Sequence, residues 1–220
     1  MRTTIKNVWD KDKKYGEYFY KMATGQLPAM FCAVALANTI KKIYKNDMKV
    51  LDVGCGAGHY LRSFRENINK NIDYTGIDFS PSFIRLAKKA FRDSAEFAVG
   101  EIQNIPFKNN QFDIVTASNI ILHLPPPPLK AFKELLRVSK KYVVARTVFG
   151  ERNYIMQEVL SNSDFGINQP DIALFKSDGI PMSFNYFNLY TESYFRDLIN
   201  KIAPKAKVNI IKDLSYKQFD

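Results

Sequence analysis

The chain has 220 residues, of which 46% are apolar and 25% are charged, proportions typical of one globular domain with a substantial core. Its two cysteines, Cys32 and Cys55, are too few for a disulfide framework and show no metal-ligand spacing, so we expect a reducing, cytoplasmic setting and no metal site. The net charge of +10 comes from scattered lysines without a basic stripe. Without such a stripe the charge gives only weak support to nucleic-acid binding, and the same field would steer in a small anion.

The first residues of the chain, 1–14, are charged rather than apolar, so the sequence predicts no signal peptide. The longest apolar run, Leu27 to Ile40, is too short to span a bilayer. We interpret this run as a helix with one buried face. A displaced secretion signal is the alternative interpretation.

Short apolar strands alternate with amphipathic helices through the middle of the chain. Strands are predicted at residues 49–53, 73–78, 95–99, 112–118 and 142–147. Helices are predicted at residues 58–67, 80–90 and 129–138. Ser80 followed by Pro81 gives the second of these helices a strong start signal. Repetition of strand, helix and strand predicts a parallel sheet covered on both faces by right-handed crossovers.

The alternation breaks after strand five. Residues 150–190 are rich in Asn, Phe and Tyr and have no clear period, so we interpret them as an insertion over the ligand edge of the sheet. Thr191 is the expected N-cap of a helix at 191–203, followed by a strand at 207–213 and room for one short strand more. The predicted fold class is α/β, with a doubly wound, mostly parallel, seven-stranded sheet.

These boundaries suggest four parts. We expect residues 1–48 to form an N-terminal helical cap and residues 49–149 the ligand-binding core. Residues 150–190 would form the insertion on the substrate side, and residues 191–220 would complete the sheet.

The first predicted strand runs into a turn with three alternate glycines, D-V-G-C-G-A-G, from Asp52 to Gly58. Each glycine gives up side-chain packing, so the pattern favours a turn against whose bare backbone a ligand lies. A tight structural turn without a ligand is the alternative. The dinucleotide fingerprint G-x-G-x-x-G fails because His59 stands where its third glycine is required.

The turn resembles that of the class I S-adenosylmethionine-dependent methyltransferases, especially their small-molecule, type 11-like branch, and the resemblance runs from about Lys49 to Thr147. It implies a Rossmann-like methyltransferase fold, S-adenosylmethionine as cofactor and S-adenosylhomocysteine as product. In that family the turn packs against the methionyl and ribose parts of the cofactor. The resemblance therefore implies that five residues of the turn contact the cofactor: Asp52, Gly54, Cys55, Gly56 and Gly58. We interpret Cys55 as a small filler and not as a nucleophile.

Two further stretches resemble the same family. Asp78 ends the second strand, where the family places an acid that binds the ribose, and a carboxylate can accept hydrogen bonds from both ribose hydroxyls. The run that follows implies that Phe79 flanks the adenine beside Ser80. The stretch V-G-E-I-Q-N-I-P-F resembles a loop near the adenine, which implies contacts from Glu101 and from the backbone amide of Ile102.

The stretch from Gln111 to Pro126 resembles the family's fourth strand and its following loop, which implies that Ser118 and Asn119 lie beside the sulfonium. Methyl transfer from a sulfonium is an in-line displacement, and orientation alone can supply about 7–11 kcal/mol of rate acceleration. A general base is needed only for a poor nucleophile that bears a proton. His123 is the candidate base, and a structural residue that ties loops together is the alternative.

Residues that could reach the acceptor lie near the end of strand five. Arg146 ends that strand, and Arg152 and Tyr154 open the insertion. A guanidinium suits a carboxylate or a phosphate, although ordinary surface charge is the alternative. Near the N-terminus, family members often lay a helix with aromatic residues over the cofactor, which implies a contact from Tyr20. The alternative is an amphipathic helix with tyrosines at its edge.

We therefore expect S-adenosylmethionine-dependent methyl transfer to a small acceptor that is polar, anionic or glycan-like, with the oligomeric state left open. An RNA or protein methyltransferase is a second hypothesis, favoured by the basic charge but disfavoured because S-N-I-I-L-H-L-P stands where an amide–proline–aromatic tetrad would follow strand four. A non-catalytic cofactor-binding protein of the same fold is a third, and a nicotinamide oxidoreductase is a fourth.

Overall fold

The computed structural model describes residues 13–159, 177, 179 and 184–213. In these residues, five parallel strands form one sheet in the order β3-β2-β1-β4-β5. The strands are β1 (Lys49–Val53), β2 (Asp73–Asp78), β3 (Glu96–Val99), β4 (Phe112–Ser118) and β5 (Ser139–Arg146). Because β1 pairs with β2 on one side and with β4 on the other, the strand order reverses at β1. Ligands of doubly wound sheets bind at such a reversal, outside the carboxyl ends of the strands.

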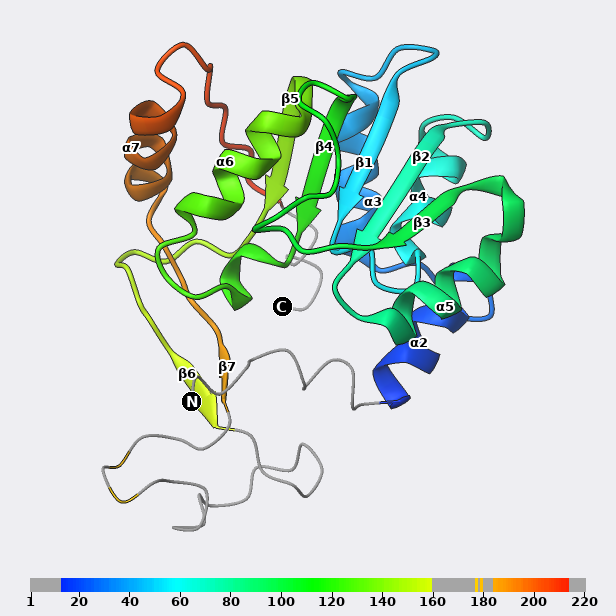
Figure 1. The fold of residues 1–220 in the computed structure, drawn as a ribbon, viewed down its shortest axis with the longest axis horizontal. Helices are drawn as coiled ribbons and strands as arrows, with labels where there is room; N and C mark the ends of the chain where they lie inside the picture. The colour runs from blue at the N-terminus through cyan, green and yellow to red at the C-terminus, as the bar shows by residue number, and fades with distance from the viewer. Residues whose placement is uncertain (1–12, 160–176, 178, 180–183, 214–220) are drawn as a thin grey trace.

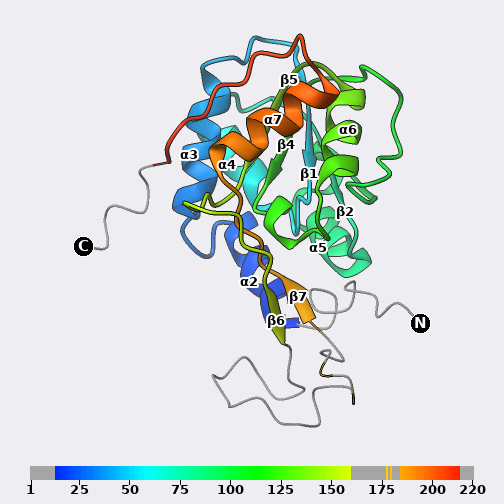
Figure 2. The same ribbon diagram turned by 90° about the vertical axis from the view of Figure 1, so that its left-hand side faces the viewer.

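Helices cover both faces of the sheet, as the alternation of strands and helices predicted. They are α3 (Phe31–Lys41), α4 (His59–Asn67), α5 (Pro81–Phe91), α6 (Leu129–Val138) and α7 (Glu192–Ile202). Consecutive residues of β1 face opposite ways. Val50 belongs to the core with α3, α4 and α5, and Leu51 to the core with α6 and α7. Figure 2 shows α3 and α4 on one side of the strands and α6 on the other.

Two helix starts have the caps that the sequence predicts. The Ser80 hydroxyl accepts a hydrogen bond from the Phe83 N–H at 3.2 Å, and Pro81 is the first residue of α5. The Thr191 hydroxyl accepts one from the Tyr194 N–H at 3.1 Å at the start of α7. Both caps satisfy a backbone donor that the helix itself leaves unpaired.

Three further elements lie at the carboxyl end of the sheet. They are α2 (Lys13–Ala23), β6 (Gln157–Val159) and β7 (Phe184–Tyr186), and two short 3-10 turns, η1 (Arg92–Ser94) and η2 (Ile121–His123), connect other elements. β6 and β7 pair in antiparallel fashion, and we call this pair the arm. Figure 1 shows the arm and α2 at the end of the sheet toward which the strand arrows point. The division into cap, core, insertion and C-terminal part remains our proposal.

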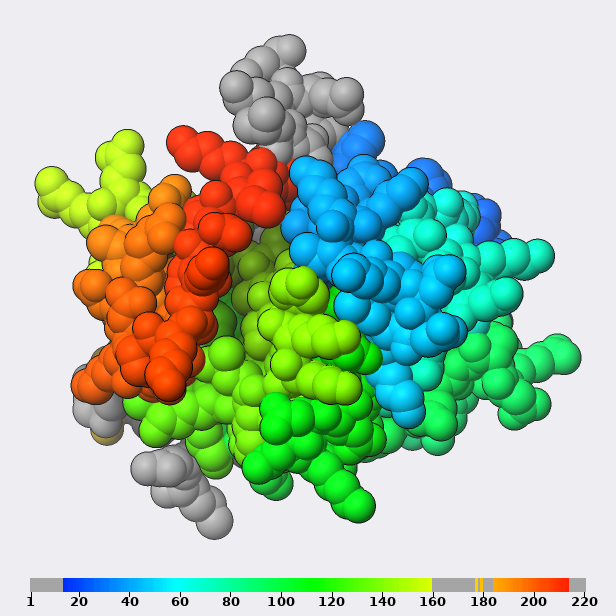
Figure 3. Space-filling model, turned by 90° about the horizontal axis from the view of Figure 1, so that it is seen from above, coloured from blue at the N-terminus to red at the C-terminus, as the bar shows by residue number. Residues whose placement is uncertain are grey.

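The sheet has five strands in the described residues, not the seven that we expected. Residues 207–213 form no strand, and any strand after Asp213 lies outside the described residues. Their backbone is held by side chains instead, since Arg196 donates to the Val208 carbonyl at 3.0 Å. Figure 3 shows this red C-terminal segment running beside the orange α7. A period-two pattern decides which side chains face inward, but a strand also needs a partner with free backbone groups.

None of the helices in the described part of the chain is long and apolar enough to cross a membrane.

Candidate cofactor site

The glycine turn connects β1 to α4 at the reversal of strand order. Gly54, Gly56 and Gly58 have φ angles of 79°, 54° and 82°, a left-handed conformation that L side chains rarely adopt. The backbone N–H groups of Gly54 and Cys55 both donate to the Ile77 carbonyl, at 2.7 and 3.0 Å. The turn is thereby fastened to the end of β2.

Each glycine of the turn meets different neighbours. A Cβ atom at Gly54 would lie 2.9 Å from Ile120, and one at Gly58 would lie 2.8 Å from the Phe91 ring. Packing against aromatic rings therefore adds to the backbone requirement for glycine at position 58, whereas at position 54 only a terminal methyl group would have to move. A Cβ atom at Gly56 would lie 3.2 Å from the His59 ring, beside the helix that covers the turn.

Cys55 is fully buried inside the turn. Burial raises the pKa of its thiol well above the ordinary value, and the charges of Asp78 and Asp52 raise it further. A thiol in this setting does not form the thiolate that a nucleophile requires. The structure agrees with its interpretation as a small filler.

Asp78 connects the end of β2 to the glycine turn. One carboxylate oxygen accepts from the Gly56 N–H at 2.9 Å, and the other accepts from the Ser80 N–H at 2.9 Å. A carboxylate oxygen can accept more than one hydrogen bond. The carboxylate is buried, and the following Phe79 is half-buried. Sequence reasoning paired Asp78 with the turn correctly, but gave no hint that the acid itself holds the turn.

Asp52 lies behind the turn and not beside it. Its side chain is 1% exposed and accepts a hydrogen bond from the Tyr74 hydroxyl at 2.7 Å. Burial raises the pKa of Asp52 to about 7, the hydrogen bond from Tyr74 opposes this rise, and the charge of Asp78 adds to it. The structure therefore gives Asp52 a partner within the core, on the α4 side of the sheet.

Ser118, at the end of β4, belongs to a buried group of polar side chains. Its hydroxyl lies 2.9 Å from the Tyr60 hydroxyl, which in turn lies 3.5 Å from the Cys32 sulfur. Burial raises the pKa of Tyr60 well above its ordinary value. This group connects α3, α4 and β4 directly behind the turn.

Asn119 and Arg146 interact at the ends of β4 and β5. The Arg146 guanidinium donates to the Asn119 amide oxygen at 2.6 Å and pairs with Asp213 at 2.8 Å. Asn119 has a φ angle of 56°, and its backbone N–H donates to the Arg146 carbonyl. Arg146, expected to hold an acceptor, thus also fastens the C-terminal segment to the edge of the site.

His123, in η2, contacts the arm. Its Nδ1 atom lies 2.8 Å from the Tyr186 carbonyl oxygen, and its ring packs edge-on against Phe187 at 6.0 Å. A carbonyl only accepts, so this contact favours a proton on Nδ1, whereas the Asn185 amide nitrogen, 3.3 Å from the same atom, favours a lone pair there. Burial lowers the pKa of His123, while the Tyr186 carbonyl and the charge of Glu158 oppose this effect.

The other expected contacts are spread along the edge of the sheet. Glu101 is exposed, whereas Ile102 is buried in the core under α6. Arg152 is exposed and Tyr154 is 46% exposed, and Tyr154 exchanges two backbone hydrogen bonds with Leu189 at the base of the arm.

Phe19 of α2 is the aromatic residue that covers the glycine turn. Its ring stacks on His59 with centroids 4.5 Å apart and planes at 10°. Tyr20, which we expected in this place, instead lies under the Lys89 ammonium at 5.1 Å. The sequence feature that could have indicated Phe19 is its helical spacing from Tyr15, which places both residues on one side of α2. Their rings lie 6.2 Å apart.

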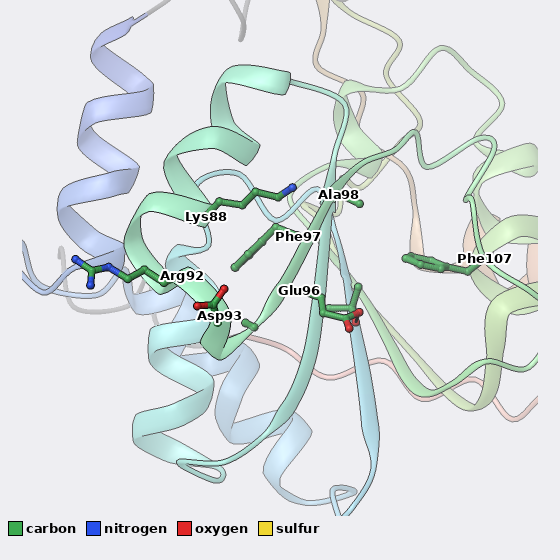
Figure 4. Close-up of a pocket in the computed structure, with 9 residues that line it drawn as sticks. Lys88, Arg92, Asp93, Glu96, Phe97, Ala98 and Phe107 are labelled. Atoms are coloured by element: carbon green, nitrogen blue, oxygen red, sulfur yellow. Dashed lines mark hydrogen bonds between the residues drawn. The ribbon is translucent and has the colours of Figure 1, made fainter.

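Two cavities lie away from the turn. One of about 630 Å³ runs along the outer edge of β3, and Figure 4 shows Phe97 and Phe107 on opposite sides of that strand. A second of about 400 Å³ is lined by residues that include Asn46 and Asp73, where β2 begins. Neither lining includes the glycine turn. Among the described residues, no group of three His, Cys, Asp or Glu side chains could hold a metal ion.

The fold resembles that of known proteins. The reversal of strand order, the glycine turn and the acid on the neighbouring strand are features of a Rossmann-like domain, in which ligands bind outside the carboxyl ends of the strands. Residues 50–142 match the family model described as a methyltransferase domain. A crystal structure of a SAM-dependent methyltransferase from Methanosarcina mazei shares the fold, with a TM-score of 0.54 and 20% identity over 74% of this chain and 82% of that one. Residues 50–142 thus match a methyltransferase domain, and the chain shares the fold of a SAM-dependent methyltransferase of known structure.

Two curated relatives cover different lengths of the chain. An uncharacterised protein of Methanocaldococcus jannaschii is 29% identical over 163 residues, which are 73% of this chain and 64% of that protein. The demethylmenaquinone methyltransferase of Staphylococcus aureus is 33% identical over 98 residues, 44% of this chain and 40% of that enzyme. The chain thus spans less than two thirds of the length of either relative.

Proposed function

We propose that this protein transfers a methyl group from S-adenosylmethionine to a small polar or anionic acceptor. The observation that carries the proposal is the contact between the Asp78 carboxylate and the Gly56 N–H, 2.9 Å apart at the reversal of strand order. It brings a buried carboxylate against a turn of bare backbone, in a stretch of the chain that matches a methyltransferase domain. When bound, the cofactor supplies a methyl group activated by a sulfonium.

The residues of the chain would then bind and orient. Asp78 would accept hydrogen bonds from the ribose hydroxyls, and Gly56 would allow close approach of the methionyl part. Phe79, Glu101 and the Ile102 amide are proposed to surround the adenine. Ser118 and Asn119 lie where the reacting centre is expected, at the end of β4.

The acceptor side depends on the arm and the end of β5. We propose that Arg152 and Tyr154, both exposed at the base of the arm, contact an anionic or polar acceptor. Arg146 is already engaged by Asp213 and Asn119, so its contribution would be to orient Asn119. His123 is proposed as the general base, because it lies in η2, directly after the end of β4.

Two other functions remain as alternatives. The net charge of +10 favours an RNA or protein acceptor, which salt-sensitive co-purification with RNA would reveal. A non-catalytic cofactor-binding protein would bind the nucleoside without turnover on any acceptor.

Calorimetric titration with S-adenosylmethionine and S-adenosylhomocysteine tests the proposal. We expect the wild-type protein to bind both below millimolar concentration. Asp78→Ala should bind at least about tenfold more weakly, since hydrogen bonds to a charged group contribute about 1.5–3 kcal/mol each. Asp93→Asn, an exposed acid in η1, is the matched control and should bind like wild type. Failure of both nucleosides to bind would refute the proposal. If they bind, a panel of radiolabelled methyl transfers would identify the acceptor.

A further inference from the structure

Two buried asparagines from the Asn-rich residues 150–190 lie next to His123. Asn185, on β7, is 4% exposed, and Asn188, shortly after β7, is fully buried. Asparagine is mostly an exposed residue, because burying an amide costs free energy unless its polar atoms are hydrogen-bonded. The contacts of these two amides therefore indicate which part of the protein needs them.

Asn188 fastens the loop on both sides of His123. Its backbone N–H donates to the Leu122 carbonyl at 2.8 Å, and its side-chain amide donates to the Leu124 carbonyl at 2.8 Å. The backbone N–H of His123 itself donates to the Ile120 carbonyl at 3.0 Å. One residue thus holds the carbonyl groups before and after the histidine, so η2 cannot turn His123 away without breaking a bond to Asn188.

Three consecutive residues of the same segment hold the His123 ring. The Tyr186 carbonyl oxygen lies 2.8 Å from Nδ1, and the Asn185 amide nitrogen lies 3.3 Å from the same atom. Phe187 packs edge-on against the ring, with centroids 6.0 Å apart. The ring and the loop that carries it are therefore fixed by one short segment more than 60 positions further along the chain.

Only one orientation of the Asn185 amide suits both neighbours of Nδ1. The Tyr186 carbonyl only accepts, so a hydrogen bond there requires a proton on Nδ1, and an amide nitrogen against that proton would bring two donors together. A half-turn of the amide exchanges its nitrogen and oxygen and places an acceptor beside Nδ1 instead. Among the described residues the Asn185 oxygen has no hydrogen-bond partner where it now lies, so the half-turn breaks no bond of that oxygen.

We propose that Asn188 and Asn185 are positioning residues for His123. Asn188 fixes the loop, while the Asn185 oxygen and the Tyr186 carbonyl hold a proton on Nδ1 and leave the lone pair on Nε2. This inference rests on the proposed function, in which His123 takes a proton from the acceptor. A proton taken up at Nε2 charges the ring, and the two oxygens at Nδ1 stabilise that charge. Neither asparagine touches a reacting atom in this arrangement.

Nitrogen NMR on the protein without ligand tests the ring directly. The chain has only two histidines, so the spectrum of His123→Phe assigns both rings. At pH 8 we expect the His123 ring to be neutral, because burial lowers its pKa, with the proton on Nδ1 and the lone pair on Nε2. A proton on Nε2 in the wild-type protein would overturn the proposal.

Asn188→Leu keeps the approximate size of the side chain and removes its donor. We expect both His123 nitrogens to move to the intermediate shifts of a ring that exchanges between tautomers, while the His59 resonances stay in place. Asn67→Leu is the matched control, because the Asn67 amide also donates to a backbone carbonyl, that of Ser63 at 2.8 Å, and this variant should move neither ring. An unchanged His123 spectrum in Asn188→Leu would restrict Asn188 to fastening the arm, and equal shifts of both histidines would indicate general loosening; either result would overturn the proposal.

Asn185→Asp tests the ring contact and leaves the contacts of the loop in place, so it remains decisive if Asn188→Leu does not fold. A carboxylate presents an oxygen to Nδ1 whichever way it turns, and the variant should therefore keep the wild-type tautomer. A change of tautomer would show that the amide nitrogen faces the ring in the wild-type protein, which contradicts the proposal.

Binding and turnover separate this inference from the proposed function. Asn188→Leu should bind S-adenosylhomocysteine like wild type, because the contacts of Asn188 are with the loop around His123. For an acceptor found in the radiolabelled panel, we expect kcat to fall by about 10²-fold with KM for S-adenosylmethionine unchanged, since a small misplacement of a reacting group costs about that factor. An unchanged kcat would refute the positioning role. If wild type bound neither nucleoside, the proposed function would fail, while the NMR spectra would still report whether the asparagines hold the ring.

Discussion

Replacing Asp52 by Asn should change how the stability of the protein depends on pH. Burial raises the pKa of Asp52 from 3.8 in its ordinary state to about 7 in the folded protein. Because the folded-state pKa is raised, the contribution of this group to stability is fully present below pH 3.8 and is lost as the pH rises through about 7. Between pH 5 and 7 the loss is about 1.4 kcal/mol per pH unit, or about 3 kcal/mol in all.

Asp52→Asn removes this loss, since the amide does not ionise and its oxygen can still accept from the Tyr74 hydroxyl. Urea unfolding of wild type and variant at pH 5, 6, 7 and 8 measures the difference in free energy of unfolding. We expect the variant to gain about 3 kcal/mol relative to wild type between pH 5 and 8. Asp113→Asn is the control: hydrogen bonding from Lys141 helps to lower the pKa of Asp113, so its contribution changes only at acidic pH. A difference between wild type and Asp52→Asn that stays constant with pH would refute the reasoning.

Three further predictions concern the turn and its surroundings. Gly58→Ala should destabilise the protein by about 2 kcal/mol more than Gly25→Ala. Both glycines have a φ angle of 82°, but only a Cβ atom at Gly58 would lie 2.8 Å from a neighbour. Chemical unfolding of the two variants measures the difference in free energy of unfolding. A double-mutant cycle on Arg146→Ala and Asp213→Ala should give a coupling energy of about 1–3 kcal/mol, since both side chains are less than a quarter exposed, and a value near zero would contradict the pairing. His123→Asn should lower kcat by about 10²-fold or more without changing the affinity for S-adenosylhomocysteine, and an unchanged kcat would restrict His123 to holding the arm.

The central sheet could be predicted from local patterns alone. Short apolar runs end at turn residues, and three of the five runs are followed by a helix. The start of one of these helices is signalled by Ser80 and Pro81. These signals depend only on neighbours along the chain. The five strands and the caps at Ser80 and Thr191 are confirmed for that reason.

Contacts between distant segments could not be predicted in this way. Which side of α2 faces the turn depends on how closely α2 approaches α5, and Gly16 permits that approach because a Cβ there would lie 3.0 Å from Leu86. The resulting orientation of α2 about its own axis brings Phe19, and not Tyr20, onto His59. Similarly, Arg146 meets Asp213 across 67 positions of sequence, so the strand pattern at 207–213 gave no sign of an ion pair.

The three glycines of the turn show why a motif does not translate into a set of ligand contacts. All three have left-handed φ angles, and Gly58 is also enclosed by the rings of Phe91 and Phe97, whereas Gly54 meets the terminal methyl group of Ile120. Only Gly56 borders a polar group without a partner, His59, and donates to the carboxylate of Asp78. A side chain at Gly56 would thus press on the His59 ring and disturb the proposed contact of Asp78 with the sugar. The middle glycine is therefore the position at which backbone conformation and ligand binding impose the same requirement.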